Sequence, residues 1–193
     1  KPSSNVHYKC LYLTALYHNG KREEALKSVE SLWLNPYVQP KACQNIFSLW
    51  QKSFYFNKQL LWRRYGLAIG SRQYALARKL KASMSETDKV VANKWLLVSR
   101  SPHKLKHLNF LPHKQNAAIH THGLRKLVKT DTSSAIKHWH KIKGEYDFSH
   151  SQKQHFYRTV ALYSAMRNYP IAEQWFKKLD VQITPKMHFE WRV

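Results

Sequence analysis

Helical periodicity runs through almost the whole 193-residue chain and constrains its fold more than any other feature. In the first segment, apolar residues recur at i, i+3, i+4, i+7 and i+8, at Tyr8, Leu11, Tyr12, Ala15 and Leu16. Cys10, Leu13 and Tyr17 form a second apolar stripe, so this helix is expected to have neighbours on two sides. No segment shows a convincing strand alternation. The pattern predicts an all-α chain.

Glycine, proline and short polar stretches divide this pattern into separate helices. The sequences VHYKCLYLTALYHNG and KREEALKSVESLWL predict the first two helices. Further helices are predicted near 40–53, 57–69, 71–83, 86–99, 113–129, 132–143, 149–167, 170–179 and 185–193. The segment 103–112 has the weakest pattern of the chain.

Four pairs of predicted helices share one arrangement, at 15–33, 66–80, 123–142 and 160–179. Each pair has a small residue followed by leucine, then a short turn, then an alanine on the second helix. The alanines would let the paired helices approach closely, as in tetratricopeptide hairpins; they are Ala25, Ala75, Ala135 and Ala172. Because the spacing between pairs is irregular, we predict an α-solenoid of irregular tetratricopeptide-like hairpins. An ordinary all-α bundle is the alternative.

The charge of the chain is strongly unbalanced, with 33 Lys and Arg against 11 Asp and Glu and a net charge of +22. Such a charge favours polyanionic partners such as nucleic acid, anionic lipid or an acidic polymer. The segment WRRYGLAIGSRQYALARKLK interleaves basic and aromatic residues. Its arginines are candidate contacts for a polyanion or glycan: Arg63, Arg64, Arg72 and Arg78. No RNA-recognition or helix-turn-helix signature accompanies them, so a basic nucleic-acid- or protein-binding module is kept as an alternative.

Catalytic, metal and cofactor motifs are not apparent. The closest histidine pairs are two residues apart and would point to different sides of a helix; they are His120/His122 and His138/His140. Glu145 and Asp147 are interpreted as part of a solvated turn. No GxGxxG, GxSxG or HExxH motif occurs, and no apolar run reaches the ~18 residues that span a bilayer. We therefore predict no catalytic residue, metal, cofactor or membrane span.

The segment REEALKSVESLWLNPYVQPKACQNIFSLWQKS carries the most specific motif of the chain. Its elements are Leu32-Trp33-Leu34 at a helix end, Gln39-Pro40-Lys41-Ala42-Cys43 in the connection, and Phe47-Ser48-Leu49-Trp50 in the next helix. This succession resembles the superhelical region of the periplasmic soluble lytic murein transglycosylases. Cys10 matches a cysteine that this family has one hairpin upstream. Beyond this motif, the helix pattern and VALYSAMRNYPIAEQWFKKL carry the resemblance.

The resemblance implies a long ring or horseshoe of helices, coupled to a separate C-terminal lysozyme-like domain. That domain cleaves the MurNAc–GlcNAc bond of peptidoglycan non-hydrolytically, forming a 1,6-anhydro product. Its Gly-Leu-Met-Gln motif does not occur in this chain. Residues 1–193 are therefore interpreted as one segment of a larger α-superhelical domain, without the catalytic domain and inactive alone. The expected partners are peptidoglycan glycan strands and that catalytic domain, and the expected location is the periplasm of a Gram-negative bacterium.

The resemblance also implies a disulfide bond between Cys10 and Cys43. The two cysteines lie on helices that would touch in a solenoid, and an oxidising periplasm permits a bridge there. The alternative is two buried thiols that never pair. The sequence alone does not give the separation of the two Cα atoms, which decides whether a bond can form.

Overall fold

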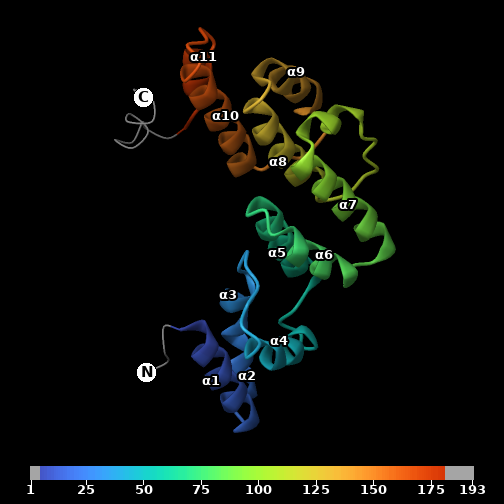
Figure 1. Cartoon of the computed structure of the whole chain (residues 1–193), viewed down its shortest axis with the longest axis vertical. Coiled ribbons are helices and arrows are strands. Elements are labelled where there is room, and N and C mark those ends of the chain that lie inside the picture. The colour runs from blue at the N-terminus through green and yellow to red at the C-terminus, as the bar shows by residue number, and fades with distance from the viewer. Residues whose placement is uncertain (1–4, 181–193) are drawn as a thin grey trace. The chain divides into compact units, whose positions relative to one another are not determined.

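The computed structural model describes residues 5–180, and none of these residues belongs to a β-strand. The chain divides into two compact units, Lys1–Ser85 and Glu86–Val193. Each unit is built from helices that pack against their neighbours along the chain (Figure 1). The predicted all-α fold of successive helical hairpins is confirmed. The helix predicted at 185–193 lies outside the described residues.

The helices of the first unit are α1 (Val6–His18), α2 (Arg22–Lys27), α3 (Val29–Trp33), α4 (Cys43–Gln51), α5 (Lys58–Gly70) and α6 (Tyr74–Ala82). Side-chain caps begin two of them, because the oxygens of Asn5 and Asn57 accept hydrogen bonds from otherwise unpaired backbone N–H groups. The turn from α1 to α2 passes through Gly20, whose φ of 85° favours glycine. α1 packs against α2 and α4, and α5 packs against α6.

Aromatic rings form the core between α3, α4 and the start of α5. Trp33 lies against Phe47, Trp50 and Phe56 with ring centroids 5.3–5.7 Å apart. Trp50 is completely buried. Such tilted and edge-on pairs add to the stabilisation from burial, so the LWL and Phe-Ser-x-Trp motifs have a packing role in this unit.

The two apolar stripes of α1 differ in how far they are buried. Cys10 and Leu13 are buried, whereas Tyr8, Leu11 and Tyr12 are 47–58% exposed. α1 has two neighbours in this unit, α2 and α4, but they do not cover the stripe of Tyr8, Leu11 and Tyr12. The helix is almost equally apolar on all sides, so its periodicity does not indicate which side the α2 and α4 contacts cover.

The helices of the second unit are α7 (Glu86–Arg100), the 3₁₀ helix η1 (Pro102–His107), α8 (Asn116–Val128), α9 (Thr132–Ile142), α10 (His150–Ala165) and α11 (Ala172–Phe176). α8 lies at its centre and packs against α7, η1, α9 and α10, while α10 also packs against α11 (Figure 1). Ser149 and Gln152 form a reciprocal capping box at the start of α10. The weak pattern at 103–112 corresponds to η1 and the loop after it.

The end of α8 is closed by Arg167 from the turn after α10. Its guanidinium donates to the carbonyl oxygens of Val128 and Lys129 at 3.1 and 2.5 Å, and to Thr132 Oγ1 at 3.0 Å. The last carbonyls of a helix lack partners within the helix. Arg167 supplies these partners and attaches α10 to the α8–α9 turn.

All four predicted hairpins are present, as α1 with α2, α5 with α6, α8 with α9, and α10 with α11. Ala25 and Ala135 are completely buried, as close helix packing requires. The prediction for Ala75 is wrong because this residue is exposed, and Ala77 is the buried alanine of α6. The buried residues of α6 are Leu76, Ala77 and Leu80.

Gly123 shows how closely α8 approaches its neighbours. A Cβ atom at this position would lie 2.3 Å from Val98 Cγ1 and 3.0 Å from Leu105 Cδ2. Val98 is completely buried and has no space into which to move. Glycine is therefore required here by the contact of α8 with α7 and η1.

Overpacking a core usually costs about 1–3 kcal/mol, and alanine recovers up to ~1 kcal/mol through its higher helix propensity. We therefore expect Gly123→Ala to lower the free energy of unfolding by up to about 2 kcal/mol. Urea unfolding followed by circular dichroism measures the change. Gly144→Ala is the control, because nothing lies within 4 Å of its added Cβ. Equal stability of the two variants would contradict the close approach.

Candidate functional site

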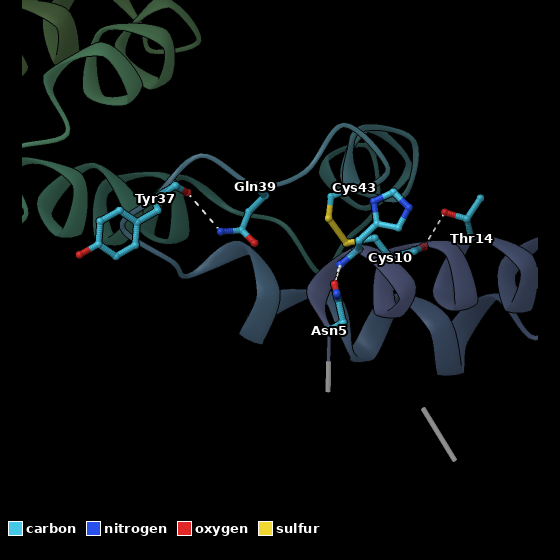
Figure 2. The surroundings of a disulfide bond; sticks show 7 residues. Asn5, Cys10, Thr14, Tyr37, Gln39 and Cys43 are labelled. Carbon is cyan, nitrogen blue, oxygen red and sulfur yellow. Dashed lines mark hydrogen bonds between the residues drawn. A yellow bond between two sulfur atoms is a disulfide. The ribbon is translucent and has the colours of Figure 1, made fainter. Parts of the chain in front are cut away.

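Cys10 and Cys43 form a disulfide bond that joins the middle of α1 to the first residue of α4 (Figure 2). Their Cα atoms are 4.8 Å apart, and 33 residues separate them in the sequence. Both residues are at most 1% exposed. Thr14 Oγ1 donates to the Cys10 carbonyl at 2.9 Å, and Gln39 Nε2 donates to the Tyr37 carbonyl in the connection before α4. The bond closes the first hairpin onto the next helix.

Arg64, one of the four candidate anion-binding arginines, lies in the aromatic core. It is only 4% exposed, and its guanidinium carbon lies 4.0 Å from the ring centroid of Trp33 and 5.6 Å from that of Phe47. Burial lowers the pKa of Arg64 to about 10. A guanidinium held against aromatic faces in this way stabilises the packing of α5 on α3 and α4. Arg64 is thus not available to a surface ligand.

The other three candidate arginines lie at the surface of the first unit. Arg63 Nη1 lies 3.4 Å from Glu30 Oε1, and this ion pair is largely exposed. Arg72 occupies the turn between α5 and α6 with a φ of 58°, and Arg78 is exposed on α6. The segment therefore divides into one core arginine, one paired arginine and two exposed arginines.

The histidines of α8 form part of the core of the second unit. His120 is 2% exposed, and its ring lies 4.5 Å from the rings of both Phe110 and Tyr146. Its Nδ1 is 3.4 Å from His138 Nε2. Burial, followed by the charge of His138, lowers the pKa of His120 to about 3. Burial, followed by Lys126 and Arg125, lowers the pKa of His122 to about 4.

The histidine, cysteine and acidic side chains of the described residues do not gather into a metal site. No group of three or more histidine, cysteine or acidic side chains there could hold a metal ion. Surface acids pair with lysines one helical turn away, as Glu23 does with Lys27 at 2.6 Å and Glu173 with Lys177 at 2.7 Å. Glu145 and Asp147 are exposed in the turn before α10, in agreement with their interpretation as a solvated turn.

A basic cluster on α8 and α10 was not predicted from the sequence. Arg125 Nε donates to Thr159 Oγ1 at 3.3 Å, and His155 lies one turn before Thr159 on α10. The pKa of His155 is lowered by burial and then by the charges of Arg125 and Arg158. The one signal in the sequence is the four-residue spacing of His155 and Thr159, which puts both residues on the same face of a helix. Nothing in the sequence shows that Arg125 lies opposite it.

No helix in the described residues is both long enough and apolar enough to cross a membrane.

Comparison with known proteins identifies relatives of one kind. No protein-family model matches the chain. The soluble lytic murein transglycosylase of Escherichia coli K12 is 28% identical over 94 residues, which are 49% of this chain and 15% of that protein. The protein of the same name from Salmonella typhimurium is 26% identical over 97 residues, again 15% of its length. The chain thus matches a small part of the length of these curated relatives.

Solved structures extend the similarity to nearly the whole chain. An inactive mutant of the lytic transglycosylase Slt from Pseudomonas aeruginosa matches 97% of this chain with a TM-score of 0.85 and 26% identity. The match covers 31% of that protein. The 70-kDa soluble lytic transglycosylase of Escherichia coli matches 94% of this chain with a TM-score of 0.72 and 17% identity, which indicates a shared fold. In sequence and in helical fold, the chain is therefore similar to a part of the soluble lytic murein transglycosylases.

Proposed function

We propose that the chain is a non-catalytic helical scaffold of a peptidoglycan lytic transglycosylase that supports the binding and turnover of cell-wall glycan. One observation carries this proposal. The Pseudomonas aeruginosa lytic transglycosylase matches 97% of this chain with a TM-score of 0.85, yet the match covers only 31% of that protein. The remaining length leaves room for a catalytic domain. We propose that such a domain lies C-terminally in the same polypeptide and carries out the cleavage.

The chemistry of the described residues supports a non-catalytic role. Glycosidic bond cleavage uses carboxyl groups that converge on the bond to be broken. Here the surface acids Glu23, Glu86 and Glu173 each form an ion pair with a nearby lysine. Asp131 caps α9 by accepting a hydrogen bond from the Ser134 backbone. These carboxylates thus have roles in ion pairing and helix capping.

The positive charge and the disulfide bond support the proposed substrate and location. Peptidoglycan carries carboxylates on its stem peptides and on lactyl groups without a stem peptide, and a net charge of +22 would attract it. Disulfide bonds form and persist in oxidising compartments such as the periplasm, and the Cys10–Cys43 bond suits that environment. We therefore propose that the chain acts in the periplasm of a Gram-negative bacterium.

Sedimentation with purified sacculi tests the proposed function. We expect the 193-residue chain to sediment with sacculi at low salt, and less as salt screens the charges, because the Debye length is about 8 Å at physiological ionic strength. Cytochrome c, another basic protein, is the control for non-specific attraction. The chain is expected to release no 1,6-anhydro-muropeptides, whereas a version extended through a catalytic domain is expected to release them.

The rival function is that of a basic helical module that binds nucleic acid, since any strongly cationic chain shows salt-dependent binding. Salt dependence therefore does not separate the two functions, but selectivity does. We expect weak and indiscriminate binding of oligonucleotides near 150 mM salt. Sub-micromolar, structure-selective RNA binding together with no sedimentation on sacculi would refute the proposal in favour of the alternative.

A further inference from the structure

In the second unit, α10 packs against α8 (Figure 1), and polar and basic residues of the two helices meet at this contact. His155, Thr159 and Tyr163 recur every four residues on α10 and so share one side of that helix. Arg125, in the last turn of α8, meets this side through its Nε, which donates to Thr159 Oγ1 at 3.3 Å. Thr159 in turn donates its hydroxyl hydrogen to the His155 carbonyl oxygen at 2.7 Å.

These hydrogen bonds fix the orientation of the Arg125 side chain and leave part of its donor capacity unused. A guanidinium carries five N–H donors, and the contact with Thr159 uses only the one at Nε. Among the described residues, no hydrogen bond involves the two terminal nitrogens of Arg125. Because Arg125 is an exposed residue, these two terminal groups are available to a ligand at the surface.

The electrostatic surroundings of Arg125 and His155 are positive. The pKa of His155 is lowered first by burial and then by Arg125 and Arg158, and the pKa of Arg125 is lowered first by burial and then by Arg158. No carboxylate contributes to either shift. The cluster therefore repels further positive charge, and a bound anion would relieve this repulsion.

We propose that Arg125, His155 and Thr159 form a binding site for a carboxylate group, of the kind that peptidoglycan carries on its stem peptides and on lactyl groups without a stem peptide. Binding of the carboxylate at this site is non-covalent. The choice of peptidoglycan as the source of the carboxylate rests on the function proposed above, whereas the site itself rests on the geometry of α8 and α10.

The neighbouring aromatic ring favours a carboxylate over a single-stranded nucleic acid. Binding of unpaired bases uses open aromatic faces on which the bases stack. Tyr163, one turn after Thr159, already has Lys129 Nζ 5.5 Å and the Arg167 guanidinium 5.7 Å from its ring centroid. Arg167 is also held by its hydrogen bonds to the end of α8. The planar guanidinium of Arg125, by contrast, matches the two oxygens of a carboxylate.

A nuclear magnetic resonance titration of the whole chain with N-acetylmuramic acid tests the site. N-acetylglucosamine is the matched ligand, since it has a similar sugar ring without the lactyl carboxylate. We expect N-acetylmuramic acid to shift the ring signals of His155 and to raise its pKa, because a negative charge stabilises the imidazolium form. N-acetylglucosamine is expected to produce neither change.

Two variants assign the effect to the proposed residues. Arg125→Gln is expected to weaken the binding of N-acetylmuramic acid by at least roughly tenfold, the effect of losing a charge-assisted contact. Arg100→Gln removes the same charge from an exposed position at the end of α7 and is expected to bind as the unchanged chain does. The proposal is overturned if the two sugars shift His155 equally, or if the two variants lose equal affinity for N-acetylmuramic acid. It is also overturned if oligothymidylate binds preferentially at His155.

Sedimentation with sacculi separates a failure of the site from a failure of the proposed function. If the chain and Arg125→Gln sediment equally and N-acetylmuramic acid leaves His155 unchanged, the site is refuted and the scaffold function stands. If the chain fails to sediment but N-acetylmuramic acid still shifts His155 in an Arg125-dependent way, the site is supported and the function is refuted.

Discussion

Replacing both Cys10 and Cys43 with alanine is expected to lower the free energy of unfolding of the first unit by about 3–4 kcal/mol. The bond connects residues that are 33 positions apart, and its loss lets the unfolded chain explore many more conformations. Such a loss is a large part of the 5–15 kcal/mol that stabilises a typical domain. Urea unfolding monitored by tryptophan fluorescence measures it, since Trp33 and Trp50 lie in the core of this unit.

Reduction of the unchanged chain supplies an independent measurement of the same effect. Treatment with a phosphine reductant should lower the stability by a similar amount, and the doubly substituted chain should not respond to it. Hydrogen exchange is expected to become faster in α1 and α4, the two helices that the bond joins. Two freely alkylated thiols in non-reduced protein, detected by intact mass, would contradict the pairing.

Acidification is expected to destabilise the second unit between about pH 6.5 and pH 4. Burial is the main cause that lowers the pKa of His120 to about 3 and that of His122 to about 4. An unfolded histidine titrates near 6.5. The neutral rings therefore contribute their full stability above that pH, and this contribution is lost as the pH falls towards the folded pKa values. The expected loss at pH 4.5 is on the order of 2 kcal/mol for each histidine.

Thermal unfolding at a series of pH values measures this dependence. His120→Phe keeps a ring against Phe110 and Tyr146 but removes the titrating group. It should therefore flatten the decline of stability below pH 6.5, although it loses the contact with His138. His103→Gln, which changes an exposed histidine, is the control and should leave the decline unchanged. A steep decline of equal size in His120→Phe would show that other groups cause it.

The sequence predicted the helices well because their signals are local. The period of the apolar residues and the turn residues located the four hairpins, including α8 with α9 and α10 with α11. The errors arose where more than one side of a helix could be buried, so that the packing partner decided the buried side. The buried face of α1 and the position of the buried alanine in α6 are the two examples.

The candidate binding residues were predicted less well, because the role of an arginine depends on what surrounds it. Arg63 and Arg64 are adjacent in the sequence, yet one is ion-paired at the surface and the other is buried against Trp33. Consecutive residues of a helix point about 100° apart, so neighbours in a basic segment need not share a surface. The cluster around Arg125 and His155 joins residues that are 30 positions apart and carries no local signal.

The sequence by itself determined the all-α architecture, the positive charge and the resemblance to lytic transglycosylases, because periodicity, composition and the motif around Cys43 lie along the chain. Only the tertiary structure decided which groups meet. It joined Cys10 to Cys43, buried His120 beside His138, and set Arg125 against Thr159. Each of these contacts depends on which sides of two helices touch. That choice follows from the packing of the whole unit, because many faces of these helices are apolar enough to be buried.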